Sequence, residues 1–319
     1  MSKTDQERVN FDSAVTRLSD RIFFGSATGA AMLAFSIVGL ILVFLGLRAW
    51  PTLQAEGLSF ITGSTWDSTV GTFQIMPMLV GSVVVAAIGI LIATPLSIFA
   101  AFFIAFVAPP RLAKLSTLVV DLLAALPSIL IGFWGASVFT PAGASWAELL
   151  NGKLGFIPLF QNSTGTFTRS PFIGGWILGI MMVPIITSVS REVMSRVDKE
   201  LINAGHALGG TTFTTLRRVI LPTSRGGILG GILLALGRGI GETIAILYVL
   251  NLVFNVNVLR PLENRGGSVA SMIAAFIGEA DDATIHALMA AGLVLFVMTL
   301  LVNVIATSIV QRAERKMAS

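Results

Sequence analysis

Six long apolar segments limit what this chain can fold into more than any other feature of its sequence. Each has close to the ~20 residues that an α-helix needs to cross the hydrocarbon core of a bilayer. Charged residues make up only 12% of the chain, about half the share of a typical soluble domain. The sequence therefore predicts an all-α polytopic membrane protein with six transmembrane helices. The predicted spans are 23–47, 77–107, 116–139, 172–190, 226–250 and 285–310.

The second apolar segment, 77–107, is too long for one simple span and too short for two spans with a turn. Pro95 lies within it, and proline lacks the N–H that an inner helical turn requires. We interpret the segment as one tilted helix with a kink near Pro95. A helix followed by a re-entrant piece is the alternative.

The loops between the spans differ in positive charge. With the N-terminus in the cytoplasm, the cytoplasmic segments contain 15 of the 21 Lys and Arg residues and the outer loops contain 5. Cytoplasmic loops of membrane proteins carry such an excess, so both termini are predicted to face the cytoplasm. This placement explains the net charge of +4 without a nucleic-acid partner. The residues before position 23 are too polar and too numerous for a cleavable signal peptide.

Two of the predicted outer loops are long, at about 48–76 and 140–171. The second contains the stretch QNSTGTFT, and its Gly, Ser, Thr and Asn content predicts irregular structure. The chain contains no low-complexity tract and no convincing short-period repeat.

The longest cytoplasmic loop, 191–225, is too regular in its pattern for a simple linker. Apolar residues recur at helical spacing and predict an amphipathic helix; they are Leu201, Ala204, Ala207 and Leu208. Glycine commonly ends a helix, so we expect this helix to stop at Gly209 and Gly210. The loop is either a surface helix on the lipid headgroups or a docking element for a soluble partner.

A second short helix is expected after these glycines. Thr211 or Thr212 provides a hydroxyl that can cap its first turn. Pro222 is expected to stop this helix before the fifth span begins. The apolar side chains of the second helix would be Phe213, Leu216 and Val219.

This loop resembles the coupling loop of ABC importer permeases. The family pattern is Glu-Ala-Ala, three residues, Gly, nine residues, Ile, one residue and Leu-Pro. The spacing, the glycine and Leu-Pro all match, whereas Asn replaces the acidic residue and Gly replaces the second Ala. The matching positions are Asn203, Ala204, Gly205, Gly209, Val219, Leu221 and Pro222. In the family this loop docks in a groove of the ATPase, so the resemblance implies coupling through 199–222, with Phe213 in the same element.

ATP hydrolysis would require a separate chain. The sequence contains no G-x-x-x-x-G-K-[ST] motif, the loop that cradles nucleotide phosphates. With no cysteine and 2 histidines, it is not expected to hold a thiolate or histidine metal site. No G-x-S-x-G motif marks a serine hydrolase. We predict a transport subunit that is not an enzyme and binds no cofactor of its own, with ATP and Mg²⁺ in the partner ATPase.

The fifth span, 226–250, carries two charges where water should be absent. Arg238 lies near its middle, and Glu242 follows four residues later. A charged residue at a helix centre costs about 2.5–3.5 kcal/mol on insertion scales, so both should face the bundle or an aqueous path. A spacing of four places them on one face of a continuous helix. Arg before Glu is the less favourable order for an i,i+4 ion pair that stabilises its own helix.

Two interpretations of this pair remain open. It is either a structural ion pair between spans or an anion site, since a guanidinium fork binds phosphate or sulfate oxygens bidentately. In an anion site, Glu242 would hold Arg238 when the site is empty, or accept a proton from the substrate. Phosphate retains a P–OH donor near neutral pH and sulfate does not, so a neighbouring carboxylate favours phosphate. The span also has 7 glycines at spacings that predict tight packing on a partner helix, such as one across a subunit interface.

Three stretches resemble the permeases of phosphate importers. ILLALGRGIGETIAI (232–246) matches a Gly-Arg-x-x-Gly-Glu-Thr segment implicated in phosphate passage, which implies a substrate path at Arg238, Glu242 and Thr243. LAALPSILIGFWG (123–135) and VPIITSVSREVMSRV (183–197) match as well. Within the second of these, Ser-Arg-Glu favours the PstC-type subunit over its PstA-type partner. The resemblance covers about 70–310.

This resemblance implies a type I ABC importer permease fold, similar to MetI. It divides the chain into a cytoplasmic N-terminal segment (1–22), a first helix with its outer loop (23–71), a permease core (72–311) and a cytoplasmic tail (312–319). It further implies a bacterial inner-membrane phosphate importer with a PstA-type permease, a PstB-type ATPase homodimer and a PstS-type extracytoplasmic phosphate-binding protein. The alternatives are a permease for sulfate or molybdate and an ion-coupled secondary anion transporter, which would need no ATPase.

Overall fold

The computed structural model describes residues 18–256 and 260–318. The chain separates into two compact units, 1–48 and 49–319. Helix α1 (Leu18–Glu56) begins in the first unit and ends in the second. Its apolar side chains are largely exposed, as Phe35 illustrates with 83% of its surface accessible. A helix with this composition and exposure needs lipid or another protein around it.

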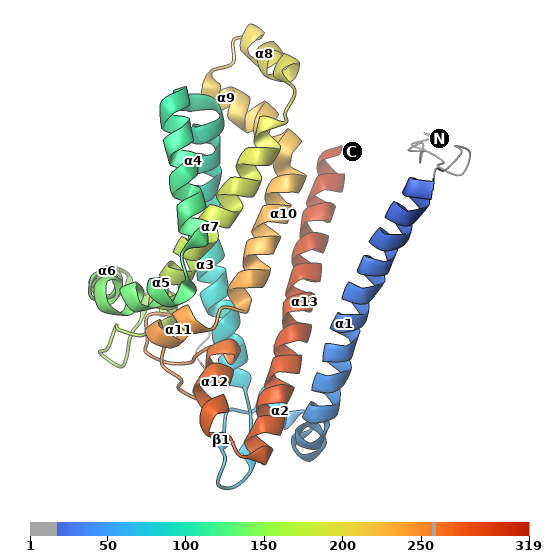
Figure 1. The fold of residues 1–319 in the computed structure, drawn as a ribbon. Coiled ribbons are helices and arrows are strands. Elements are labelled where there is room, and N and C mark those ends of the chain that lie inside the picture. The colour runs from blue at the N-terminus through green and yellow to red at the C-terminus, as the bar shows by residue number, and fades with distance from the viewer. Residues whose placement is uncertain (1–17, 257–259, 319) are drawn as a thin grey trace. The chain divides into compact units, whose positions relative to one another are not determined.

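Three long helices form the centre of the second unit (Figure 1). They are α3 (Met76–Phe102), α7 (Pro171–Ser195) and α10 (Leu221–Ile240). Small residues let α3 and α7 approach closely, because a Cβ on Gly89 would lie only 3.3 Å from the backbone nitrogen of Gly179. Their contact surface supplies much of the main apolar core, including Ile173, Ile177, Leu178, Met182 and Ile186.

Helix α10 packs on α7 through its own glycines. Gly231 faces Val189, and a Cβ added to this glycine would lie 2.9 Å from the valine Cβ. Gly227 faces Val193 in the same way. The close packing predicted from the glycine spacing is therefore confirmed for Gly227 and Gly231, and their partner is a helix of the same chain.

The second predicted span is one continuous helical segment. α3 continues through a π-helical turn, η2 (Phe103–Val107), so that Met76–Val107 forms one candidate span of 32 residues with Pro95 inside α3. The alternative of a helix plus a re-entrant piece is wrong. The chain then turns at Pro109 into α4.

The third predicted span, 116–139, is broken, which corrects the expectation of one crossing helix. α4 (Pro110–Ala125) is followed by α5 (Ser128–Trp134), a π-helical turn η3 (Gly135–Phe139) and α6 (Thr140–Leu154). The chain bends by 93° between α4 and the segment that starts with α5. Pro127 explains the break, since a proline disfavours the helical conformation of the residue before it, and Leu126 is extended with ψ 131°.

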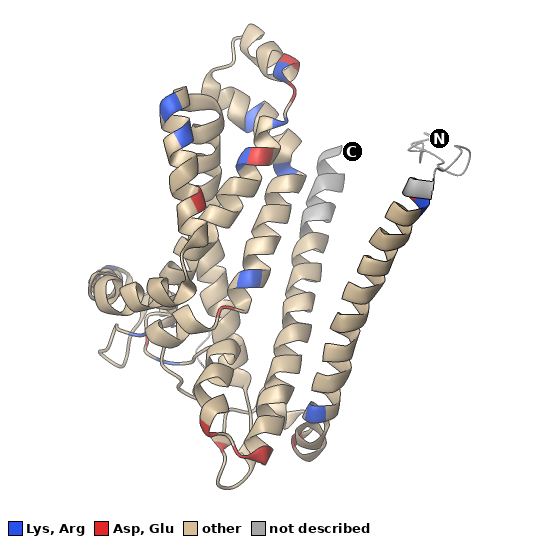
Figure 2. Cartoon of the chain, viewed as in Figure 1, with Lys and Arg blue, Asp and Glu red and all other residues tan. Residues whose placement is uncertain are grey.

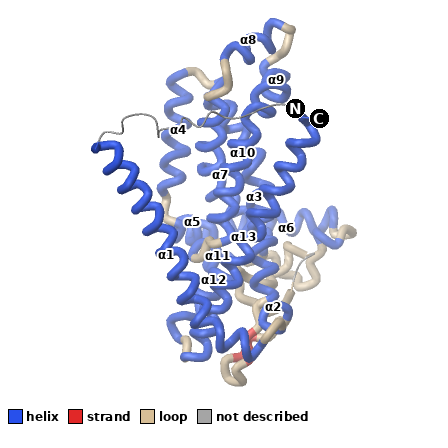
Figure 3. Tube along the Cα trace, turned by 90° about the vertical axis from the view of Figure 1, so that its right-hand side faces the viewer, coloured by secondary structure: helices blue, strands red, loops and turns tan. Residues whose placement is uncertain are grey.

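The long loops also contain more regular structure than expected. The 140–171 loop was predicted to be irregular, yet its first half is α6, followed by the short 3₁₀ helix η4 (Pro158–Phe160). The 48–76 segment contains the end of α1, then α2 (Ser59–Thr62). It ends in an antiparallel hairpin of β1 (Trp66–Asp67) and β2 (Thr72–Phe73) with Trp66 opposite Phe73. Among the described residues these are the only named strands, and Figure 3 shows them beside an otherwise helical trace.

The remaining helices complete the bundle. After α7 come α8 (Lys199–Ala207), α9 (Thr212–Thr215), the π-helical turn η5 (Leu216–Ile220) and α10. Beyond α10 come α11 (Ile244–Val249), α12 (Val269–Phe276), the 3₁₀ turn η6 (Ile277–Glu279) and α13 (Asp282–Ala318). In the described residues five helices are long and apolar enough to span a membrane, and the bent α4–α6 pair makes up to six. The all-α polytopic prediction is confirmed.

Candidate functional site

The fifth span is interrupted at the residues that the sequence singled out. α10 ends at Ile240 and α11 begins at Ile244, so Gly241, Glu242 and Thr243 form a break between two helices. The Thr243 hydroxyl donates to the Gly241 carbonyl oxygen at 3.1 Å, which partly satisfies the freed backbone. Non-helical backbone inside a membrane is tolerated only where protein buries it or where it lines a cavity. The break is therefore expected to be enclosed by protein or to line a cavity.

Glu242 caps the short helix that follows the break. Only 9% of its surface is exposed, and its Oε1 accepts a hydrogen bond from the Ala245 N–H at 3.3 Å. The expectation that Arg238 and Glu242 share one face of a continuous helix is wrong, because the helix ends between them. No ion pair joins the two side chains in the described part of the chain.

Arg238 lies in the last turn of α10 with apolar neighbours. Its guanidinium makes no hydrogen bond or ion pair with any residue that the structure describes. It lines two small hollows, one with Met182 and Glu242 and the other with Leu126 at the α4–α5 break; Met181 and Ile185 border both. The negative end of the α10 dipole favours a cation at this position. An unpartnered guanidinium in such surroundings has its donors available for an anion.

The two broken spans lie against each other. α5 packs on α11, where Gly132 lies so close to Ala245 that an added Cβ would be 2.6 Å from the Ala245 Cα. Glycine at 132 thus permits the approach, and a larger residue would push the two half-helices apart. A neighbouring hollow of about 340 Å³ is lined by Leu123, Leu126, Leu130, Ile131, Trp134 and Ile180. None of these six residues carries a charge, whereas Arg238 borders the two smaller hollows described above.

The loop at the other end of α10 has the predicted helix–glycine–helix form. Asp198 caps α8 by accepting from the Glu200 N–H at 2.9 Å, and Thr211 caps α9 by accepting from the Thr214 N–H at 3.2 Å. Gly209 lies between the helices with φ +79°, a conformation that side chains with a Cβ rarely adopt. The capping expected from Thr211 is confirmed.

The apolar side chains predicted for α8 and α9 are mostly exposed. Leu201, Leu208 and Phe213 are 49%, 89% and 62% exposed, and Asn203 and Ala204 are exposed as well. The side of the loop that faces the bundle carries Ile202 and Gly205 instead; Ile202 packs with the buried Val197, Leu216 and Ile220. Gly205 lies against Thr215 and Val219. The predicted apolar face thus points away from the bundle and leaves a surface that a partner can cover.

Pro222 does not stop the second helix, contrary to expectation. α9, η5 and α10 form one continuous helical segment from Thr212 to Ile240, 29 residues long. In the π-helical turn, the Leu221 N–H donates to the Leu216 carbonyl, five residues back, and this altered pairing precedes the proline that lacks an N–H. One continuous helical segment, about 40 Å long along its path, therefore connects the exposed loop to Arg238, and Figure 1 shows it running from α9 into α10.

A cluster at the end of the bundle remote from α8 was not anticipated from the sequence. Glu263, 1% exposed, accepts from the Ser163 N–H at 3.0 Å and from its hydroxyl at 2.7 Å. Arg260 and Arg265 approach the same carboxylate at 3.3 and 3.2 Å. Burial disfavours the charged carboxylate and by itself would raise the pKa of Glu263. The hydrogen bonds from Ser163 and Arg260 and the charge of Arg265 outweigh this effect and lower the pKa below its ordinary value. These residues lie in loops without periodicity, so no sequence pattern connects positions 163 and 263.

Glu263→Gln should destabilise the solubilised protein near neutral pH. The variant loses the charge that strengthens these hydrogen bonds, and hydrogen bonds to charged groups contribute about 1.5–3 kcal/mol. Because the folded-state pKa lies below the ordinary 4.5, this stabilisation is present above that pH and is lost as the pH falls through the folded-state value. Thermal unfolding across this pH range measures the difference between wild type and variant, which should be largest near neutrality and shrink in acid.

The matched control for this prediction is Glu148→Gln, since Glu148 is an exposed glutamate on α6. Its unfolding temperature should follow that of the wild type at every pH. Equal unfolding temperatures for the two variants near neutral pH would contradict the stabilising role of Glu263.

Comparison with known proteins places the chain in a family. Residues 93–319 match the model of the binding-protein-dependent transport system inner membrane component. The chain is 33% identical to the phosphate transport system permease protein PstC of Mesorhizobium japonicum, over 97% of this chain and 96% of that protein. It is 35% identical to PstC of Mycobacterium leprae, over 93% and 95% of the two chains. PstC of Xylella fastidiosa is 34% identical, over 90% and 89%.

Solved structures show the same fold. A chain of a bacterial ABC transporter involved in import of the acidic polysaccharide alginate aligns with a TM-score of 0.54 and 14% identity, over 91% of this chain and 98% of that one. A chain of the inward-facing MetNI methionine ABC transporter aligns with a TM-score of 0.51 and 15% identity, over 74% and 93%. The fold is that of a type I ABC importer permease. Such a permease is a transport subunit and not an enzyme, and it works with a partner permease and an ATPase.

The family and the structure thus agree on a multi-pass inner-membrane protein. Charged residues are sparse along the middle of the second unit's helices and more frequent near their ends (Figure 2), as expected for spans in a bilayer. The family match covers the α4–α5 and α10–α11 breaks and the α8–α9 loop. The chain therefore belongs to the binding-protein-dependent transport system inner membrane components and, within them, to the PstC family of permeases.

Proposed function

We propose that this chain is the transmembrane permease subunit of an ATP-driven inorganic phosphate importer. The observation that carries the proposal is the Arg238 guanidinium, which has no protein partner in the described chain and lies beside a broken span. The helical rod from Thr212 to Ile240 connects this guanidinium to an exposed loop. An anion site and a docking loop on the same helix fit a transporter that is driven by a partner. The names of the PstC relatives support phosphate as the anion.

Glu242 favours phosphate over sulfate in this proposal. Its carboxylate borders the same hollow as Arg238, and one of its oxygens is already used to cap α11. The remaining lone pairs can accept a hydrogen bond from the P–OH of phosphate but would repel sulfate, which lacks that proton near neutral pH. Thr243, which follows in the break, adds a hydroxyl that forms part of the proposed path.

The proposed assembly contains a PstA-type permease, a PstB-type ATPase homodimer and a PstS-type phosphate-binding protein. ATP and Mg²⁺ would bind the ATPase, and the exposed α8–α9 loop would dock in its groove. In this arrangement α8 and both chain termini lie in the cytoplasm, which the excess of 15 over 5 Lys and Arg residues supports. The α12 end of the bundle and the Glu263 cluster then face the outside.

Copurification followed by transport tests the proposal. The complex with its partners, reconstituted in vesicles, should take up phosphate only when ATP is supplied to the ATPase, and sulfate and molybdate should be poor substrates. ATP-dependent uptake of sulfate or molybdate in place of phosphate would favour a permease for another oxyanion. Uptake driven by an ion gradient without ATP would instead favour a secondary transporter.

A further inference from the structure

Arg169, in the loop before α7, has a backbone conformation that requires an explanation. Its φ is +52°, and among the described residues it is the only non-glycine with a positive φ. A residue with a Cβ is disfavoured in this region, and it stays there only where the surrounding structure holds it. Such strained positions cluster at sites that bind ligands. The role of Arg169 follows from the contacts of its loop and of its side chain.

The loop around Arg169 is fastened to the chain that follows α11. The Phe172 N–H donates to the Pro261 carbonyl at 2.9 Å, and the Asn162 side-chain amide donates to the Leu262 carbonyl at 3.0 Å. Ser163 adds its two hydrogen bonds to the buried Glu263. These attachments on either side of Arg169 fix the loop, so the strained residue cannot relax without breaking them.

The Arg169 side chain is held by a neutral group. Its Nη1 donates to Asn251 Oδ1 at 3.0 Å, and the Asn251 amide in turn donates to Asn264 Oδ1 at 2.9 Å. This ladder orients the guanidinium but uses only one of its five N–H donors. No carboxylate pairs with Arg169 in the described chain, whereas Arg265 of the adjoining loop is paired with Glu263. Arg169 is thus oriented, exposed and not neutralised.

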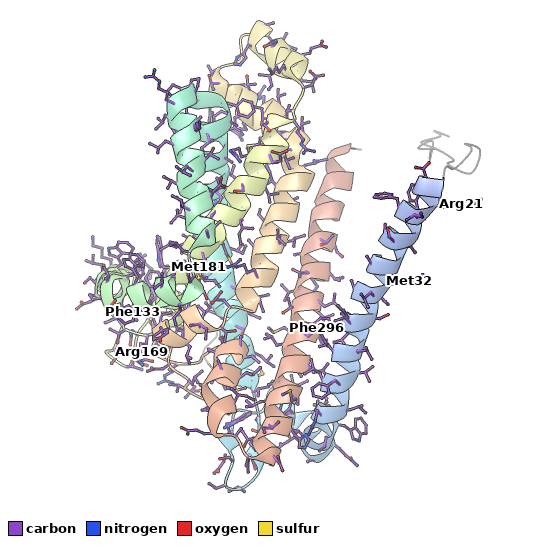
Figure 4. All side chains as sticks on the ribbon, viewed as in Figure 1. Arg21, Met32, Phe133, Arg169, Met181 and Phe296 are labelled. Atoms are coloured by element: carbon purple, nitrogen blue, oxygen red, sulfur yellow. The ribbon has the colours of Figure 1, made fainter. Side chains whose placement is uncertain are left out.

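Arg169 is also attached to the broken span that carries Arg238. Asn251 follows α11 by two residues, and α11 starts directly after the Glu242–Thr243 break. Arg238 thus lies before the start of α11, and Arg169 contacts a residue just after its end. Figure 4 labels Arg169 in the loop between α6 and α7, farther from α8 and α9 than Met181 is. In the orientation proposed above, this is the outer side of the site.

We propose that Arg169 is an outer receiving site for the oxyanion, which it binds before the anion reaches Arg238. This inference rests on the proposed function, because it assumes that an anion enters from this side. Asn251 holds the guanidinium fork in place, and the remaining donors bind two oxygens of a tetrahedral oxyanion. With Arg260 and Arg265 nearby against Glu263, the local charge is positive, which draws anions toward the entrance. The fork recognises shape and charge, so it accepts phosphate and sulfate alike.

Transport by the complete complex with its loaded binding protein tests the proposal. Arg169→Gln should lower the initial uptake rate at limiting loaded binding protein about tenfold, within the range by which a charged entrance raises the rate of anion capture. Arg169→Lys keeps the charge and should retain most of the rate. Lys153→Gln removes an exposed positive charge from α6 and is the matched control, with uptake expected at the wild-type level. Wild-type uptake by an assembled Arg169→Gln complex would overturn the proposal.

Asn251→Asp separates anion binding from a purely structural role. The new carboxylate would pair with Arg169 and strengthen its attachment while neutralising it. Uptake by Asn251→Asp should therefore fall about tenfold, as expected for Arg169→Gln. This variant keeps the proposal testable if the Arg169→Gln complex fails to assemble. Asn264→Ala removes the hydrogen bond that Asn251 donates without adding charge, and should lower uptake much less than Asn251→Asp does. Unchanged or faster uptake by Asn251→Asp would show that Arg169 only holds the loop.

A binding measurement distinguishes failure of this inference from failure of the proposed function. Phenylglyoxal modifies accessible guanidinium groups, and peptide mass analysis reports its reaction at Arg169 in the purified complex. Inorganic phosphate and sulfate should each slow this reaction several-fold relative to chloride at equal ionic strength, with Arg111 on α4 unaffected. Equal rates in all three salts would overturn the receiving site. Protection in a complex that transports no phosphate would refute the proposed function and leave the anion site standing.

Discussion

Replacing Arg238 by glutamine should abolish most ATP-dependent phosphate uptake and leave the folded complex intact. The guanidinium has no partner in the described chain, so its removal breaks no internal bond and leaves no buried acceptor unsatisfied. What the variant loses is the charge-assisted contact with the anion, for which about 1.5–3 kcal/mol is typical. That loss corresponds to roughly 10- to 100-fold slower uptake. Initial uptake rates and the yield of assembled complex are the measurements.

Arg238→Lys and Arg111→Gln complete this experiment. Lysine keeps the charge but not the planar fork, so its uptake should lie between those of wild type and glutamine variant. Arg111 lies at the start of α4, away from the α10–α11 break, and its glutamine variant should transport normally. Normal uptake by Arg238→Gln would refute contact with the anion. If the Arg238→Gln variant lost both assembly and uptake, the result would favour a structural role for Arg238.

Replacing Leu208 by aspartate should uncouple the permease from its ATPase without unfolding it. Leu208 is 89% exposed directly before Gly209, so the isolated chain has little packing to lose there. In the assembled importer, the same side chain would lie in the groove of the ATPase. Burying a leucine contributes about 1.5–3 kcal/mol, and a buried unpaired carboxylate adds a further penalty. We expect at least roughly tenfold less copurified ATPase and a matching loss of phosphate uptake.

Leu58→Asp is the matched control for the loop variant. Leu58 is 82% exposed and precedes α2, at the end of the chain's core that is remote from α8. Its variant should retain the ATPase and transport phosphate. Since the chain has no cysteine, single cysteines at positions 201, 208 and 213 provide a second measurement, and each should crosslink to the ATPase. Full retention of the ATPase by Leu208→Asp, with no crosslink along the loop, would refute docking at this surface.

One helical segment joins the proposed docking loop to the proposed anion site at Arg238. η5 allows the α9 helix to continue past Pro222 into α10, and α10 ends at the residues beside Arg238. A displacement of the loop by the ATPase would therefore be transmitted along the helix axis to the anion site. The glycines that face α7 let this helix pack closely on Val189 and Val193. The proposed docking loop and the proposed anion site are thus joined by one helical segment.

The sequence alone determined the class of protein, the approximate positions of its apolar segments and the conspicuous charges within them. Hydropathy and loop charge are local quantities that each segment carries whatever its neighbours are, so they predicted helices and an orientation. Spacing likewise placed Gly209 after α8 and Thr211 at the start of α9. An arginine within an apolar span is conspicuous because of its cost, which is why Arg238 was found without a structure.

The tertiary structure alone decided where the spans break and which side of each element faces inward. Hydropathy does not distinguish a crossing helix from one bent at Pro127, or a helix through position 242 from one that ends at Ile240. Those outcomes depend on contacts between distant segments, such as Gly132 on Ala245. The same holds for Leu208, which is exposed because Ile202 occupies the inner side. Arg169 and Asn251 lie 82 positions apart, and only the folded chain brings that arginine and its neutral partner together.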